Sequence, residues 1–130
     1  MRGLRVFIVE DEPLVAVVLQ DMVVDSGGEV AATAQSVVDA LAKMDLQPFD
    51  MAVLDVDLAG RSCHPVAAEL RRRKIPFLFA SGSGEHALHP QDAGAPVLHK
   101  PFAEGDLMRA MTALQPRPGS AGSDAPSSPI

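Results

Sequence analysis

The 130-residue sequence contains no tryptophan, no tyrosine and a single cysteine, Cys63. One cysteine cannot form a disulfide within the chain, which fits a reducing compartment. Acidic residues at positions 10–12 interrupt the first apolar stretch before it reaches the length of a signal peptide. No apolar run approaches the roughly eighteen residues that a membrane span requires. We therefore expect a cytoplasmic protein with no membrane segment.

An excess of positive charge is also missing. Seventeen acidic residues outnumber eleven basic ones, which gives a net charge of −6. A nucleic-acid-binding surface needs a basic patch, so we predict no nucleic-acid partner. An acidic chain instead suits a site that holds a cation. The apolar share is 47% and the aromatic share only 4%, so the length and composition predict one domain with a largely aliphatic core.

Apolar strands alternate with amphipathic helices along the chain. The predicted strands are residues 4–9, 29–34, 50–55, 75–80 and 96–100. The predicted helices are 14–25, 37–44, 65–74 and 104–114, and Ser36 is expected to cap the second. Residues 83–96 show little periodicity, so we expect one short helix there at most. Strand and helix in alternation predict a doubly wound α/β fold, a parallel sheet covered on both faces.

Helical spacing also predicts which side chains are buried. The first helix has one apolar line of Leu14, Val18 and Met22 and a second line of Val15, Leu19 and Val23, so we expect a wide buried face. In the last helix, Leu107, Met108, Met111 and Leu114 are expected to point inward. Twelve of the sixteen residues 115–130 are Pro, Gly, Ser or Ala. We therefore divide the chain into a domain of residues 1–114 and a disordered tail of residues 115–130.

Polar residues follow four of the predicted strands. They are Glu10, Asp11 and Glu12 after the first, Asp55 and Asp57 at the third, Ser81 after the fourth and Lys100 at the fifth. Carboxyl ends of parallel strands meet at one edge of a sheet, where ligands bind. Crowded carboxylates need a cation, and hard oxygen donors favour Mg²⁺. A carboxylate placed there can act as a nucleophile toward a phosphoryl group, forming an acyl phosphate.

Each of these signals has a simpler explanation when it is taken alone. An acidic pair after a strand often caps a helix, an aspartate at a strand end often makes a turn, and Ser-Gly or Lys-Pro often marks a loop. Four such signals at four strand ends, in order, favour a functional site instead.

The segments "VFIVEDE", "AVLDVDL", "FLFASG" and "LHKPF" resemble the response regulator receiver domain, the phospho-acceptor half of bacterial two-component signalling. The resemblance covers residues 4–114. It implies a five-stranded flavodoxin-like (CheY-like) sheet with the strand order 2-1-3-4-5. It also implies that a sensor histidine kinase or a phosphotransfer protein donates a phosphoryl group to the domain.

The resemblance assigns a role to each matching residue. Asp55 matches the phospho-acceptor, and Asp11 and Asp55 match direct Mg²⁺ ligands. Glu10 matches an acid that acts through metal-bound water, and the backbone carbonyl of Asp57 matches a further ligand. Ser81 matches the residue whose hydroxyl turns toward the phosphoryl group, and Lys100 matches the lysine that pairs with that group. The peptide bond from Lys100 to Pro101 matches one that is cis in the family. Asp57 and Ser83 match positions that tune the lifetime of the phosphoryl group.

The sequence departs from the family pattern at three places. Val97 stands where most members carry the aromatic residue that turns inward on activation. Ser81 and Lys100 are nineteen positions apart, a few fewer than usual, so the fourth helix is expected to be short or irregular. The loop "LAGRSCHPV" lacks the usual Pro-Gly turn. It looks similar to a subgroup of small receivers with "GG-R" and "PFxFxTG" segments.

Other interpretations remain open on the sequence. "DVDL" also resembles the nucleophile motif of haloacid-dehalogenase-type phosphatases, and a glutamate followed by DxD resembles the Toprim nuclease site. A degenerate receiver that only binds partners is a further alternative. His86 and His89 could share a helical turn, but no further ligand completes a zinc set, and Cys63 is interpreted as a packing residue. We expect a single-domain receiver that catalyses only its own phosphorylation and dephosphorylation. It would signal through an unknown downstream protein or act as a phosphate sink.

Overall fold

A computed structural model of the chain describes residues 3–58, 61–81, 90–92, 94–100 and 102–114. The strands of one sheet are β1 (Arg5–Val9), β2 (Glu29–Ala34), β3 (Met51–Asp55), β6 (Phe77–Ser81) and β7 (Val97–His99). The helices are α1 (Pro13–Asp25), α2 (Val37–Lys43), α3 (His64–Arg72), α4 (Glu104–Leu114) and the short 3-10 helix η2 (Pro90–Asp92). A small antiparallel hairpin precedes α3, and its two strands, β4 (Asp57–Leu58) and β5 (Arg61–Ser62), have two residues each. The predicted boundaries of strands and long helices are correct to within two residues.

The strands of the sheet are parallel and run in the order β2-β1-β3-β6-β7. When the small hairpin is set aside, this is the predicted order 2-1-3-4-5, and the doubly wound fold is confirmed. The chain first adds β2 on one side of β1 and then places β3 on the other side. Ligands bind in such sheets beyond the carboxyl ends of the strands, at the point where the order reverses.

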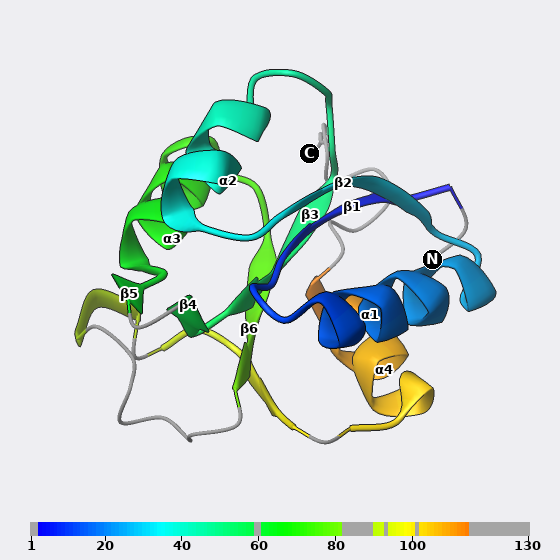
Figure 1. Ribbon diagram of the computed structural model, residues 1–130. Helices are drawn as coiled ribbons and strands as arrows, with labels where there is room; N and C mark the ends of the chain where they lie inside the picture. The colour runs from blue at the N-terminus through cyan, green and yellow to red at the C-terminus, as the bar shows by residue number, and fades with distance from the viewer. Residues whose placement is uncertain (1–2, 59–60, 82–89, 93, 101, 115–130) are drawn as a thin grey trace, which may run out of the picture.

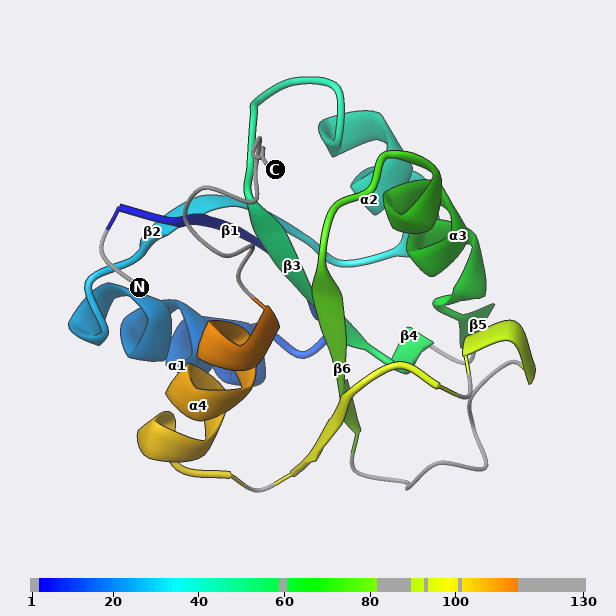
Figure 2. The same ribbon diagram turned by 180° about the vertical axis from the view of Figure 1, so that it is seen from behind.

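Among the described residues, α1 and α4 cover one face of the sheet and α2 and α3 cover the other (Figures 1 and 2). In β1, Val6 and Ile8 join the core beneath α1 and α4, while Phe7 and Val9 join the core beneath α2 and α3. Successive residues of a strand point to opposite faces, so one short strand serves both cores. Strands β3 and β6 are buried along their whole length, as expected for a parallel sheet with two covered faces.

The prediction of a wide buried face on α1 is wrong in part. Leu19 and Val23 are buried, but Leu14 is 81% exposed and Val18 is 50% exposed. Helix α1 packs on the sheet and on α4, and these contacts cover one stripe of the helix. Leu14 and Val18 therefore lie on the surface, whereas Met22, the third residue of that predicted line, is partly buried against the core. In α4, Leu107 and Met111 are buried as predicted, whereas Met108 is 37% exposed.

Local signals explain where the helices begin and end. The Ser36 side chain accepts a hydrogen bond of 3.0 Å from the Asp39 backbone N–H, so it is the predicted cap of α2. Helix α1 ends in a Schellman motif with Gly27 at φ +94°. Helix α3 ends in the same motif, but Lys74 occupies the left-handed position at φ +61°. That conformation strains a residue that carries a Cβ atom.

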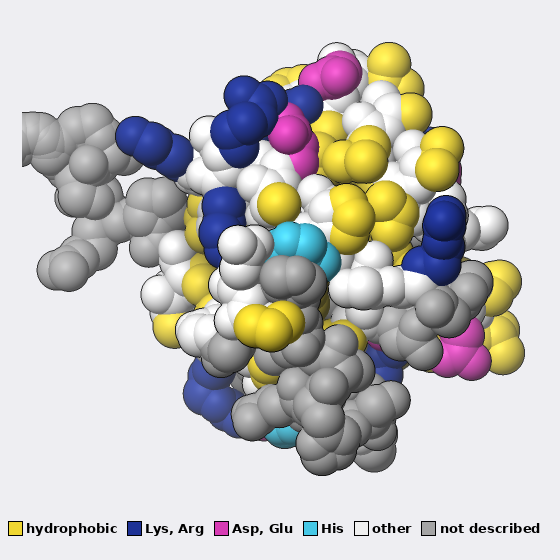
Figure 3. Space-filling view, turned by 90° about the vertical axis from the view of Figure 1, so that its left-hand side faces the viewer, with side chains coloured by type: hydrophobic (Ala, Val, Ile, Leu, Met, Phe, Trp, Pro, Cys, Tyr) yellow, Lys and Arg dark blue, Asp and Glu magenta, His cyan; other side chains and the backbone are white. Residues whose placement is uncertain are grey.

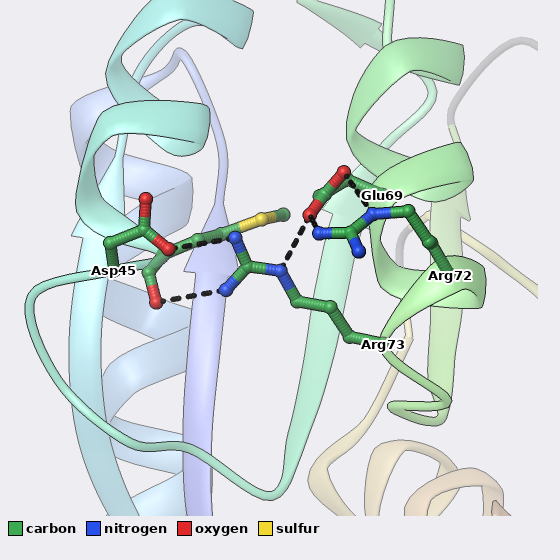
Figure 4. A network of polar contacts seen from close by, with 5 residues as sticks. Asp45, Glu69, Arg72 and Arg73 are labelled. Atoms are coloured by element: carbon green, nitrogen blue, oxygen red, sulfur yellow. Dashed lines mark hydrogen bonds and ion pairs between the residues drawn. The ribbon is translucent and has the colours of Figure 1, made fainter.

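Side chains with opposite charges join α2 to α3 (Figure 4). The Arg73 guanidinium donates to Glu69 and to Asp45, in both cases at 2.7 Å, and Arg72 also donates to Glu69. Hydrogen bonds from Arg72 and Arg73 lower the pKa of Glu69 to about 2. Figure 3 shows the face made by α2 and α3, where hydrophobic side chains lie exposed among basic ones.

Several predictions fall on parts of the chain that are not described. The predicted tail, Ser83, His86, His89 and the bond into Pro101 lie outside the described residues. For residues 83–96, where we expected one short helix at most, the described residues 90–92 and 94–96 contain the 3-10 helix η2. A search of the described residues finds no helix that is both long and apolar enough to cross a membrane.

Candidate functional site

The third strand brings Asp55 to the edge of the sheet where the predicted site residues meet. Asp55 is the last residue of β3, and its residue surface is 8% exposed. In the register of the sheet, Asp55 pairs with Ala80 and Leu54 pairs with Val9. Ser81 and Glu10, which follow Ala80 and Val9, therefore lie at the same edge.

Three predicted metal ligands lie close together. Glu10, Asp11 and Asp55 each offer a carboxylate oxygen, and these oxygens all lie within 4.8 Å of one another. Glu10 is 1% exposed, so its charge has little access to solvent. Like charges at this spacing repel, and a divalent cation would remove the repulsion. The donor set is all oxygen, which suits Mg²⁺.

Lys100 brings a positive charge to the site. Its Nζ donates to Glu10 Oε1 at 2.9 Å and lies 3.7 Å from Asp55 Oδ2. Burial of the ammonium opposes its charge, but the hydrogen bond to Glu10 and the nearby charges of Asp55, Glu10 and Glu12 together outweigh burial and raise the pKa of Lys100. Lys100 is thus held as a cation between two carboxylates. The sequence identified Lys100 but not its hydrogen bond with Glu10.

Backbone hydrogen bonds fix these side chains in place. The Lys100 N–H donates to the Ser81 carbonyl at 2.8 Å, which joins the ends of β6 and β7. The Glu12 N–H donates to Glu10 Oε2 at 3.2 Å, so both oxygens of Glu10 accept hydrogen bonds. Ser81 is 2% exposed and ends β6. Asp57 begins β4, two residues beyond Asp55, and the role of its carbonyl as a ligand stays a prediction.

The sequence did not reveal a second polar cluster near this edge. Asp92 of η2 is 1% exposed, and its carboxylate contacts two side chains of α3, His64 and Arg71. Residues 83–96 lack periodicity, so no pattern pointed to a buried carboxylate there. Cys63 is 1% exposed, as a packing residue should be. Burial raises the pKa of its thiol, and the negative charges of Asp55 and Asp92 raise it further.

An apolar groove of about 470 Å³ adjoins the site. It runs between α1 and the segment before α4, and Lys100 lies at its polar end. The residues that line it are Leu14, Val15, Val18, Leu19, Met22, Lys100 and Phe102. The exposed apolar side chains of α1 therefore line a groove that shares Lys100 with the site.

Comparison with known proteins places these features in context. Residues 6–112 match the family described as the response regulator receiver domain. The transcriptional regulatory protein TcrA of Mycobacterium tuberculosis is 34% identical over 120 residues, which cover 88% of this chain and 47% of TcrA. The transcriptional regulatory protein PdtaR of the same species is 31% identical over 111 residues, which cover 82% of this chain and 54% of PdtaR. The chain thus spans about half the length of these two relatives.

Solved structures of similar proteins share the fold of this chain. SdrG from Sphingomonas melonis Fr1 is 37% identical and superposes with a TM-score of 0.77, covering 86% of this chain and 96% of SdrG. The receiver domain of PhyR from Erythrobacter litoralis is 25% identical with a TM-score of 0.80, covering 91% of this chain and 96% of that one. A further solution structure describes SdrG in a BeF3-activated conformation, and that chain is 38% identical with a TM-score of 0.74 over 88% of this chain and 98% of that one.

Proposed function

Because the chain belongs to the response regulator receiver domain family, we propose that Asp55 accepts a phosphoryl group in a Mg²⁺-dependent reaction. The observation that carries the proposal is the cluster of three carboxylates within 4.8 Å, with the Lys100 ammonium 3.7 Å from Asp55. A structural role alone gives no reason to gather three carboxylates at this edge, because their mutual repulsion destabilises the fold.

Each residue of the cluster has a distinct task. An oxygen of Asp55 attacks phosphorus, the bond from phosphorus to the donor atom breaks, and the donor atom keeps the electron pair. Lys100 and the hydroxyl of Ser81 complement the negative charge on the phosphoryl oxygens. Glu10 holds Lys100 beside Asp55 through the 2.9 Å hydrogen bond. Catalysis of this kind is mostly positioning and charge neutralisation.

The residues present fit a magnesium ion. Asp11 and Asp55 would be direct ligands, Glu10 would act through metal-bound water, and the carbonyl of Asp57 would complete the protein donors. When bound, the ion neutralises the carboxylates and the charge of the phosphoryl group. Mg²⁺ usually keeps several waters and binds through one or two carboxylates, which suits this small donor set.

The apolar groove beside Lys100 supplies a surface for the protein that donates the phosphoryl group. Leu14 and Val18 line it and are largely exposed, and Lys100 belongs to both the groove and the acceptor site. A helix of a histidine kinase or phosphotransfer protein that lays its apolar face in this groove would bring a phosphohistidine close to Asp55. The output of the phosphorylated domain is then contact with a downstream protein. The BeF3-activated conformation described for SdrG supports such a two-state domain.

The haloacid-dehalogenase alternative has no support. The family match extends over residues 6–112, and Asp55 ends the third strand along the chain, with Asp57 just beyond it, rather than the first. Since a phosphohydrolase turns over and a receiver is labelled once, the stoichiometry of labelling separates the two classes.

The test is labelling of the purified protein with acetyl phosphate and Mg²⁺. We expect one phosphoryl group per chain in the wild type, none in Asp55→Asn, and wild-type labelling in the matched control Asp21→Asn, since Asp21 is exposed on α1. Labelling that persists in Asp55→Asn would contradict the assignment of the acceptor. Pull-down with beryllofluoride-treated and untreated protein then tests whether a downstream protein binds on activation.

A further inference from the structure

We propose that Asp92 is a positioning residue for Lys100. Its buried carboxylate fastens the segment that leads into β7 to helix α3, and this contact fixes the strand from which Lys100 reaches Asp55. The inference rests on the proposed function, because Lys100 acts on the reaction only if Asp55 accepts a phosphoryl group.

The carboxylate of Asp92 is held from two sides. His64 Nδ1 lies 3.1 Å from Asp92 Oδ2, and Arg71 Nη1 lies 2.5 Å from Asp92 Oδ1. His64 and Arg71 are seven residues apart on α3, so both project from the same side of that helix. The side chain of Asp92 is only 2% exposed. Removing either partner would leave part of this buried charge uncompensated, so the contacts with His64 and Arg71 hold Asp92 in place.

The same contact reaches the sheet. The Arg71 guanidinium also lies over the ring of Phe77, 5.3 Å from its centroid. Phe77 begins β6, the strand that pairs with β7. Arg71 therefore holds η2 and the start of β6 to one helix, and these two pieces flank the entry to β7.

A short path of hydrogen bonds leads from Asp92 to Lys100. The Asp92 carbonyl accepts from the Ala95 N–H at 2.9 Å, and the Pro96 carbonyl accepts from the Phe79 N–H at 2.9 Å. Strand β7 follows at once, and the Lys100 N–H then donates to Ser81. Within the described part of the chain, β7 has three residues and pairs with β6 alone. An edge strand this short has few pairing residues of its own, so contacts at its two ends, near Asp92 and at Lys100, add to the pairing with β6 and help to fix its position.

Lys100 is sensitive to the position of β7. Its Nζ lies 2.9 Å from one Glu10 oxygen and 3.7 Å from one Asp55 oxygen, and a small movement of the strand changes both distances. Asp92 itself contacts the side chains of α3 rather than this pair. Both Asp55 and Asp92 raise the pKa of the Cys63 thiol, which indicates that the two carboxylates lie around the same buried residue.

The test is a double-mutant cycle on the initial rate of labelling by acetyl phosphate at saturating Mg²⁺. We expect Asp92→Asn to slow labelling about tenfold in the wild-type background, since small misplacements of a positioned group have effects of this size. In the Lys100→Ala background, Asp92→Asn should alter the labelling rate by less than about twofold, because the side chain that Asp92 positions is absent. Arg72→Gln is the matched control, since Arg72 is a neighbouring α3 arginine paired with Glu69.

Two further measurements decide the question if Asp92→Asn folds poorly or Lys100→Ala labels too slowly to measure. Arg71→Gln leaves the contact between His64 and Asp92 and should slow labelling less, in the same Lys100-dependent way. The NMR signal of the Lys100 ammonium should shift toward those of surface lysines in both variants.

Equal slowing in the two backgrounds, or an unchanged Lys100 signal, would show that Asp92 is merely structural and would overturn the inference. Absence of labelling in the wild type would instead overturn the proposed function.

Discussion

The carboxylate cluster should destabilise the metal-free protein, and replacing Asp11 by its near-isostere asparagine tests this directly. Glu10 and Asp55 form ion pairs with Lys100, and replacing either one would break that pair, so Asp11 is the carboxylate to replace. At the 4.8 Å limit of the cluster, a pair of unit charges repels by about 0.9 kcal/mol in water and about 3.5 kcal/mol at an effective dielectric constant of about 20.

The expected gain follows from these limits. Asp11 is half-buried and meets two carboxylates, while Lys100 offsets part of the repulsion. We expect Asp11→Asn to increase the free energy of unfolding by about 1–2 kcal/mol without metal. In a domain of this size each kcal/mol raises Tm by about 4 °C. The gain should fall at high salt, because salt screens partly exposed charges.

Magnesium should reverse the order of stability. A ligand at a hundredfold excess over its Kd stabilises the folded state by about 2.7 kcal/mol, and the wild type should gain most of this while Asp11→Asn gains much less. Urea unfolding of both proteins, with EDTA and with Mg²⁺, measures the four free energies, and Asp21→Asn serves as the control. If Asp11→Asn were less stable than the wild type in EDTA, or if Mg²⁺ stabilised both proteins equally, the electrostatic account of the site would be wrong.

Three other perturbations have defined outcomes. Lys74→Gly should raise the free energy of unfolding by about 0.5–1 kcal/mol, because glycine adopts the left-handed conformation at φ +61° without strain. Gly27→Ala should lower the free energy of unfolding by a similar amount. Urea unfolding measures both changes, and a lower stability of Lys74→Gly would contradict the claim that Lys74 is strained. Glu69 has a folded-state pKa of about 2, below its ordinary 4.5, so its contribution is present above about pH 4.5 and is lost as the pH falls toward 2. The stability difference between the wild type and Glu69→Gln should follow that curve, and a pH-independent difference would contradict it. Leu14→Glu should slow phosphoryl transfer from a protein donor at least tenfold while labelling by acetyl phosphate stays at the wild-type rate. The reason is that Leu14 lines the groove but does not belong to the carboxylate cluster. Equal slowing with both donors would exclude the groove as the docking surface.

Most of the fold could be predicted because its signals are local. The apolar runs of β3 and β6 mark strands buried on both faces, and Ser36 and Gly27 mark the ends of helices. Lys74 carries no such signal, since lysine is not the residue expected in a left-handed position. The sequence also overstated the buried face of α1, because periodicity gives the apolar side of a helix but not the width that its neighbours cover.

The predicted site residues share one simple property. Glu10, Asp11, Asp55, Ser81 and Lys100 each lie at or just beyond the end of a strand. In a parallel sheet that property alone brings them to one edge. Asp92 has no such position, which is why its burial against α3 could not be predicted from its neighbours in the chain.

The sequence by itself therefore determined the order of strands and helices, the sheet type and the identity of the residues that gather around Asp55, because strand period and strand ends are properties of neighbouring residues. Only the tertiary structure decided which charges pair. Lys100 lies closer to the Glu10 carboxylate than to that of Asp55, and Asp92 pairs with His64 and Arg71. The physical reason is that pairing depends on distances of a few ångströms between segments up to ninety residues apart. Such distances depend on how the helices pack on the sheet, and no local pattern encodes them.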